Sequence, residues 1–298
     1  MSQTSERAKT RLDNLAAIEP LLGALRTISM GTWQMAQHRL AEMQRYEQNY
    51  SRVLSDVLPQ IHQQGLPTEE PLQKRSGEAS AIALIIGTER GLCGKFNEAL
   101  ADQAVNWIAS EHQDQAHLWV MGSRLAKALE KRKLIPDWFH PLPAGDLLSY
   151  TQAYQMTQSW LDEFEDWQFN SLTLLYNQSQ RGGRLQFSTL PLLPYQLQTS
   201  LSEPTPAEEN WPPPIIETDP KGIYHQIVLH FIASSFYQVL LKSAIAEHAS
   251  RFHMMEEAKK NADEIMAELY LVINAERKRK ITQDMQELAV GAGLIDNR

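Results

Sequence analysis

Apolar residues recur at steps of three and four through two long segments, one at each end of the chain. The C-terminal segment has no glycine or proline from Ile223 to Val290 and is rich in residues that favour helix. At about 1.5 Å per residue, it predicts a helix roughly 100 Å long. We place Asp219 at its N-cap and Pro220 in its first turn. The glycines of the final "VGAGLIDNR" allow the helix to end.

The N-terminal segment, about residues 5–58, carries a matching stripe that we expect Pro59 to end. Pro20, Gly23 and Gly31 interrupt this helix and should each weaken or bend it locally. Two long stripes are best buried against each other, which predicts an antiparallel coiled coil of the two ends. An ordinary helical bundle is the alternative, although no other predicted helix is long enough to complete one.

Between these segments, short apolar runs alternate with helical stretches. The runs predict strands at 81–87, 117–122, 171–177 and 184–193, and the stretches predict helices at 96–112, 123–133 and 150–164. Such alternation indicates a small α/β sheet domain. The fold class is therefore α+β, with an N-terminal coiled-coil helix (1–60), a central α/β domain (78–200), a proline-rich linker (201–222) and a C-terminal coiled-coil helix (223–298).

Composition argues against several classes of protein and of binding site. The 298 residues have a net charge of −8 and a pI near 5.6, which argues against a general nucleic-acid binder. Cys93 is the only cysteine, which excludes an internal disulfide framework and a multi-cysteine zinc site. We expect it to be a small buried thiol. The N-terminus is not signal-like and the apolar runs fall short of the ~20 residues of a membrane span. We therefore expect an intracellular chain that meets a membrane only through partners.

The stretch "LIIGTERGLCGKFNEAL", residues 84–100, has the outline of a phosphate-binding loop, because an apolar run leads into glycines and a Gly-Lys pair. The spacing argues against one. Glu89 stands where the first glycine of such a loop belongs, and Phe96 stands where a hydroxyl should reach the metal ion. We predict instead a structural turn, in which Gly91 and Gly94 adopt backbone conformations closed to other residues. Phe96 or its neighbour then begins the next helix.

Three stretches carry a resemblance to a known family. The turn "ERGLCGKFN" resembles the "DRGLCGG-N" signature of the γ subunits of F-type ATP synthases. The segment "NWPPPIIETDPKG" looks like their W-x(5)-E-x-D-P-K stretch, and the final helix is similar to their N-A-x(5)-E-L to I-T-Q-E-L-x-E-I-x-x-G-A pattern. Matching positions in that helix are Asn261, Ala262, Glu268, Leu269, Asn274, Arg277, Ile281, Thr282, Gln283, Glu287, Gly291 and Ala292. The resemblance covers the whole chain.

The chain also departs from this family. A lysine-rich N-terminal run of the family is replaced by "PLLGALRTISMGTWQM", in which Arg26 is the only charge. Lys95 stands at a position where the family has glycine, Lys278 where it has glutamine, and Ile273 where it has tyrosine. Two readings of these departures stay open: a divergent γ subunit of the standard enzyme, or a member of the alternative, sodium-linked (N-type) branch.

The resemblance implies a rotor subunit of the central stalk, which couples ion flow through a membrane ring to ATP synthesis or hydrolysis. It implies no catalytic residues, cofactor or metal in the chain itself. The implied partners are the α and β subunits of the hexameric ring, the ε subunit and the membrane c-ring, with no nucleic acid. The implied location is peripheral, on the cytoplasmic side of the cell or thylakoid membrane. The residues that it places against the α/β ring are Arg277, Lys278, Lys280, Ile281, Thr282, Gln283, Glu287 and Leu288.

These residues have their own physical logic. The run "ERKRK", residues 276–280, places four cations within about one helical turn, so at least one must face whatever surrounds the helix. The resemblance implies that an acidic loop of the β subunits passes this cluster of cations and that their attraction transmits torque. The alternative is a solvated face of like charges. The apolar tip "ELAVGAGLI" is expected to sit in an apolar sleeve of the ring, and a frayed terminus is its alternative.

Two rival functions were weighed on the sequence. An enzyme would need convergent catalytic groups, but the nine histidines are scattered and no H-E-x-x-H, G-x-S-x-G or D-x-D-x-D-G pattern occurs. A coiled-coil scaffold unrelated to rotation would explain the long helices. It would leave the "ERGLCG" and "ITQ" matches unexplained.

Overall fold

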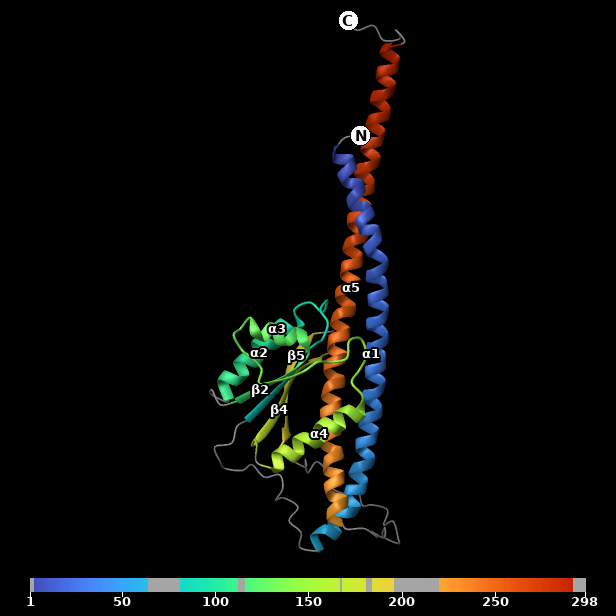
Figure 1. Cartoon of the computed structure of the whole chain (residues 1–298). Coiled ribbons are helices and arrows are strands. Elements are labelled where there is room, and N and C mark those ends of the chain that lie inside the picture. The colour runs from blue at the N-terminus through green and yellow to red at the C-terminus, as the bar shows by residue number, and fades with distance from the viewer. Residues whose placement is uncertain are drawn as a thin grey trace. The chain divides into compact units, whose positions relative to one another are not determined.

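The computed structural model describes residues 3–63, 81–111, 116–166, 168–180, 184–195 and 220–291. The chain forms two compact units, one from Met1–Ser29 with Arg251–Arg298 and the other from Met30–Ser250. Two long helices, α1 (Gln3–Gln63) and α5 (Pro220–Gly291), contribute to both units. Figure 1 shows them as the blue and the orange-to-red ribbons.

Both long helices confirm the prediction, but their ends differ from it. Helix α1 runs without interruption through Pro20, Gly23 and Gly31 and continues to Gln63, so the expectation that Pro59 ends it was wrong. A proline removes only one backbone donor, and a long helix can continue past it at a local cost. Helix α5 begins at Pro220, which confirms that this proline lies in its first turn, although the boundary between linker and helix was placed at residues 222 and 223. Its expected N-cap, Asp219, the preceding linker up to that residue, and the C-terminal glycine tail from residue 292 lie outside the described residues.

By length and composition alone, α5 could cross a membrane over Gly222–Val290. This was not predicted from the sequence, because polar residues break up the apolar runs of α5. Among the described residues, the 18-residue stretch of α5 that is apolar enough to span a membrane is 78% buried inside the protein. This burial is typical of a helix in the core of a folded domain, which can be as long and as apolar as a membrane span.

The second unit contains a five-stranded sheet with the strand order β3-β2-β1-β4-β5. Four strands confirm the prediction within two residues: β1 (Ala81–Ile86), β2 (Ala116–Met121), β4 (Ser171–Ser179) and β5 (Leu185–Leu193). The first four strands in this order are parallel, and β5 pairs antiparallel with β4. Strand β3 (Trp138–His140) was not predicted, because three residues carry too little periodicity to be recognised without their pairing to β2.

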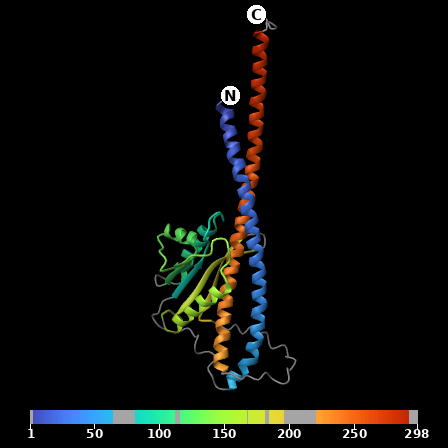
Figure 2. The same ribbon diagram turned by 45° about the vertical axis from the view of Figure 1, so that its right-hand side comes forward.

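Three helices belong to this sheet and agree with the predicted ones: α2 (Phe96–Glu111), α3 (Ser123–Glu130) and α4 (Tyr150–Glu165). Alternate residues of β1 point to opposite faces of the sheet. Ala83 and Ile85 belong to a core with α2 and α3, whereas Ile82 and its alternate neighbours belong to a core with α4, α5 and α1. The sheet is therefore a middle layer between these two sets of helices, as Figure 2 also shows.

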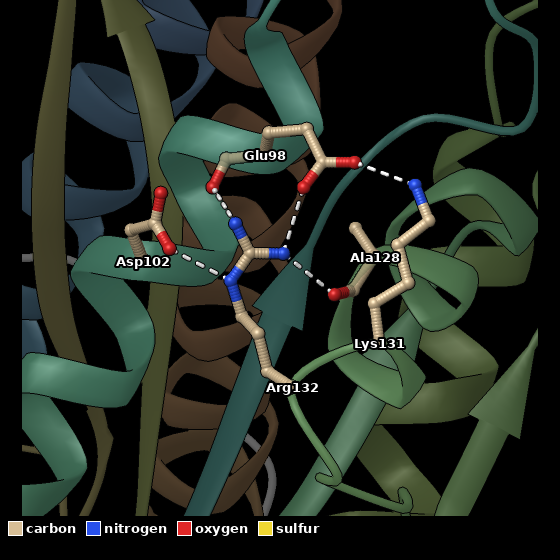
Figure 3. A network of polar contacts seen from close by, with 5 residues as sticks. All are labelled: Glu98, Asp102, Ala128, Lys131 and Arg132. Carbon is tan, nitrogen blue, oxygen red and sulfur yellow. Dashed lines mark hydrogen bonds and ion pairs between the residues drawn. The ribbon is translucent and has the colours of Figure 1, made fainter.

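Helices α2 and α3 are joined by a network around Arg132, which follows α3 (Figure 3). Its guanidinium donates to Glu98 Oε2 and to Asp102 Oδ1, both at 2.7 Å, and to the carbonyl oxygens of Glu98 and Ala128. Lys131 donates to the other oxygen of Glu98 at 3.0 Å. Hydrogen bonds from Arg132 and Lys131 lower the pKa of Glu98, and those from Arg132 lower that of Asp102. These charge-assisted hydrogen bonds to two carboxylates of α2 hold the two helices together over one face of the sheet.

In each unit, segments of α1 and α5 lie side by side and run antiparallel. In the first unit, Glu19 contacts Lys259 and Arg26 contacts Glu256. In the second, Glu47 accepts from Gln238 at 2.6 Å, and the ring of Tyr50 lies 6.5 Å from that of Phe231. Residue numbers rise along α1 as they fall along α5, which is the predicted antiparallel pairing.

Candidate functional site

The turn after β1 is held by hydrogen bonds among its own side chains. The amide oxygen of Asn97 accepts from the Thr88 backbone at 3.1 Å, and its amide nitrogen donates to the Thr88 hydroxyl at 2.8 Å. That hydroxyl donates in turn to the carbonyl oxygen of Arg90 at 2.8 Å. Phe96 begins α2 and is fully buried, and Cys93 is a buried thiol, which confirms both predictions. The polar groups of the turn are thus used internally.

The contacts of Glu89 argue against a phosphate-binding site at this turn. Its carboxylate accepts hydrogen bonds from the backbone and the hydroxyl of Ser123, the first residue of α3, and from the backbone of Leu142. Burial raises the pKa of Glu89, but these hydrogen bonds outweigh it, and the net pKa lies below its usual value. The N-terminus of a helix attracts an anion. Here the protein supplies that anion from its own side chain.

The predicted roles of the two glycines in this turn have different outcomes. Gly94 has a φ of 62°, in the left-handed region, which confirms the prediction for this residue. The prediction was wrong for Gly91, whose φ is not positive; the left-handed residue beside it is Leu92, with a φ of 64°. Two further glycines, Gly87 and Gly122, were not predicted to matter, because their close neighbours lie on distant parts of the chain. A Cβ atom at Gly87 would lie 2.3 Å from that of Leu125, and one at Gly122 would lie 2.8 Å from the Thr88 backbone.

The predicted partner contacts lie on α5 in the first unit, and every one of them is exposed. A groove of about 950 Å³ separates this part of α5 from the start of α1. Four of the predicted residues line it: Arg277, Lys280, Gln283 and Glu287. The lining from α1 consists of Ser5, Lys9, Leu12 and Asp13. The structure therefore brings half of the predicted set together around one charged groove.

The remaining predicted residues, Lys278, Ile281, Thr282 and Leu288, are not among the groove residues. On the side of α5 that does not line the groove, Ile281, Met285 and Leu288 follow each other at steps of four and three, which places them on one helical face. Their side chains are 50%, 66% and 73% exposed. Met285 was missed, although its spacing from its two predicted neighbours could have identified it. This exposed apolar face is therefore a candidate binding surface in the first unit.

Two of the predicted hydrogen-bonding residues are already engaged within α5. The Thr282 hydroxyl donates to the carbonyl oxygen of Lys278 at 3.0 Å, and the Gln283 amide donates to Glu287 at 2.9 Å. A threonine hydroxyl that donates can still accept a hydrogen bond. Any partner that uses Thr282 in this arrangement must therefore supply the donor. Among the described residues, no group of three or more His, Cys, Asp or Glu side chains is arranged to hold a metal ion.

Comparisons with known proteins extend these observations. A family model described as ATP synthase matches residues 4–293 of the chain. The ATP synthase gamma chain of Solibacter usitatus is 23% identical over 288 residues, which cover 97% of this chain and 98% of that protein. The gamma chain of Geobacter metallireducens is 25% identical over 290 residues, covering 95% and 99%. Among solved structures, a chain of the Tetrahymena thermophila mitochondrial ATP synthase central stalk and c-ring aligns with a TM-score of 0.53 at 16% identity. That alignment covers 80% of this chain and 99% of the other, and indicates a shared fold.

Proposed function

Because the chain belongs to the ATP synthase family, with gamma chains as full-length relatives, we propose that it is the rotor subunit of the central stalk of an F-type ATP synthase. The observation that carries this proposal is the family match from residue 4 to residue 293, which leaves neither the helix pair nor the α/β domain unaccounted for. In this role the chain couples ion flow through a membrane ring to ATP synthesis or hydrolysis. It belongs to the peripheral part of the complex, on its cytoplasmic side.

The chain is proposed to be non-catalytic. Its nearest approach to a nucleotide-binding motif is the turn at residues 87–97, and there Glu89 occupies the N-terminus of α3. A bound phosphate would have to displace this carboxylate against charge repulsion. The purified chain alone is therefore expected to hydrolyse no ATP above a blank. ATP hydrolysis should appear only with the α and β subunits.

The end of α5 is the proposed contact with the α/β ring. The face formed by Ile281, Met285 and Leu288 fits an apolar sleeve, because burying an exposed apolar side chain contributes roughly 1.5–3 kcal/mol. Arg277 and Lys278 are exposed on the turn that precedes this face. Cations in this position fit an acidic loop that passes them as the catalytic sites open and close. In this proposal, the apolar face forms the contact that turns inside the ring. Arg277 and Lys278 form the grip, meaning the cations that transmit torque through the acidic loop.

The α/β domain is the proposed foot, which contacts the ε subunit and the membrane c-ring. Its described surface carries large exposed apolar side chains, notably Ile135, Phe139 and Leu92. We propose that these side chains belong to the surface that the ε subunit and the c-ring cover. Co-purification should therefore recover a hexameric ATPase and one ε-type subunit with each copy of this chain. A scaffold protein unrelated to rotation would recover neither.

The grip is tested by reversing Arg277 and Lys278 to glutamate in the reconstituted, membrane-embedded complex. Repulsion from the acidic loop should leave ATP hydrolysis present but reduce ATP-driven ion pumping several-fold, because the two processes are no longer coupled. Lys260→Glu is the control, since Lys260 is an exposed cation of the same helix that lies outside the cation cluster at residues 277–280. Pumping that is equally efficient in the reversed variant and the control would refute the proposed grip.

A further inference from the structure

The buried side of the first unit follows the heptad spacing of a coiled coil. On α1, the buried or half-buried positions at alternating steps of four and three are Ala8, Leu12, Leu15, Glu19, Leu22, Arg26 and Ser29. On α5, the corresponding positions are Met255, Lys259, Ala262, Met266, Leu269, Ile273 and Glu276. This spacing is that of a seam between two supercoiled helices. Two of the seam positions on α1, and two on α5, hold charged residues.

Three of these charged seam residues, Glu19, Arg26 and Lys259, form cross-helix contacts at a regular interval. The Lys259 ammonium lies 2.6 Å from a carboxylate oxygen of Glu19, and these side chains are only 35% and 28% exposed. Seven residues further along α1, the Arg26 guanidinium lies 6.0 Å from the ring centre of Phe252, which is seven residues earlier on α5. The two contacts therefore define one register. Extended by another heptad, this register places Leu12 opposite Met266.

Helix α1 offers a second apolar face that is not the buried one. Ile18, Leu21 and Ile28 are 48%, 61% and 55% exposed, and with Leu25 they repeat at steps of three and four. Each of these residues immediately precedes a seam residue, so a rotation of α1 by one residue, about 100°, would bring them into the seam and turn the present seam residues out of it. Over residues 18–28 the exposed face contains no charge, whereas the buried face contains Glu19 and Arg26. Nearer the N-terminus, the residues that precede seam positions are Arg7, Arg11 and Asn14. Over residues 18–29, apolar burial alone would therefore favour the face that the structure leaves exposed, whereas Ala8, Leu12 and Leu15 favour the observed face nearer the N-terminus.

We propose that the ion pair between Glu19 and Lys259 is a register lock, which selects the buried face of α1 and its axial position against α5. A polar residue in a coiled-coil seam specifies register because every other register leaves it without a partner. In the rotated packing, Lys259 would meet Ile18 or Leu21 in place of a carboxylate. The pair thus positions the start of α1 beside the groove at Arg277 and Lys280. This inference concerns the packing of one chain and is independent of the proposed partners.

The test measures register in the full chain with engineered cysteine pairs. Leu12→Cys with Met266→Cys reports the observed register, and Leu12→Cys with Ile273→Cys reports a slip of one heptad. Cys93 is buried and is retained in all variants. Lys259→Glu breaks the lock, Glu19→Lys with Lys259→Glu restores it with exchanged charges, and Lys260→Glu is the control outside the seam.

We expect Lys259→Glu to slow formation of the 12–266 disulfide by at least about fivefold, a loss appropriate to a partly buried ion pair. The charge-exchanged variant should recover most of the rate, and Lys260→Glu should retain it. A cysteine at Leu21 supplies a second measurement, because rotation should slow its reaction with a maleimide in Lys259→Glu. The proposal is overturned if Lys259→Glu retains the parental 12–266 rate. It is also overturned if the rate falls but exchanging the charges does not restore it.

Discussion

Gly87 should be the least replaceable glycine of the turn after β1, although it lies outside the stretch that resembles the family signature. An added Cβ would meet the Cβ of Leu125 at 2.3 Å and the amide oxygen of Asn97 at 2.9 Å. Leu125 is fully buried, and its Cβ is fixed to the backbone of α3. Gly87→Ala therefore has to displace α3 or break the bond from the Thr88 backbone to Asn97.

The expected loss follows from three contributions. Overpacking a buried site costs about 1–3 kcal/mol, and losing one buried hydrogen bond costs about 1 kcal/mol more. Replacing glycine restricts the unfolded chain, which offsets roughly 0.4–1 kcal/mol. Gly87→Ala should thus lower the free energy of unfolding by roughly 1–4 kcal/mol. Gly91→Ala is the matched control, because its Cβ would lie at an ordinary 3.6 Å from Arg124 and its φ is not positive. This variant should be neutral or slightly stabilised.

Urea unfolding followed by tryptophan fluorescence provides the assay. Trp119, Trp138 and Trp160 pack against one another in the same unit, with ring centres between 5.1 and 6.1 Å apart, and report on its core. The reasoning is refuted if Gly87→Ala lies within about 0.5 kcal/mol of the parent, the range of a neutral surface substitution. It is equally refuted if Gly91→Ala loses as much stability as Gly87→Ala.

Three further predictions concern side chains. The lowered pKa of Glu89 contributes stability above the unfolded pKa of about 4.3, and this contribution is lost as pH falls through the folded value. The deficit of Glu89→Gln relative to the parent, measured by urea unfolding, should therefore be largest at neutral pH and shrink on acidification below that value; a constant deficit would contradict this. Arg132→Ala should cost about 1 kcal/mol and Lys131→Ala close to nothing, because only Arg132 bridges two carboxylates and two carbonyl oxygens. Equal thermal shifts for the two variants would contradict that difference. Met285→Ser with Leu288→Ser should leave the melting temperature of the isolated chain unchanged but reduce its recovery with the α/β ring, and unchanged recovery would remove the apolar face from the contact.

Much of the fold was readable from local patterns. The absence of glycine and proline over Ile223–Val290 predicted α5 almost to its ends, and β1 was predicted to within one residue. Phe96 in place of a hydroxyl was sufficient to argue against a phosphate loop. These features depend on residues close together in the chain, and propensity and period report directly on such residues.

The tertiary structure decided what depends on residues far apart. Glu89 closes the N-terminus of α3, 34 residues away, and Gly87 is required because that helix approaches it closely. The three residues of β3 become a strand only by pairing with β2. The sequence determined that α1 is a long helix with apolar stripes, but two stripes compete over residues 18–29. A partner on α5, Lys259, distinguishes them, because a charged group at a seam is stable only opposite its counter-ion.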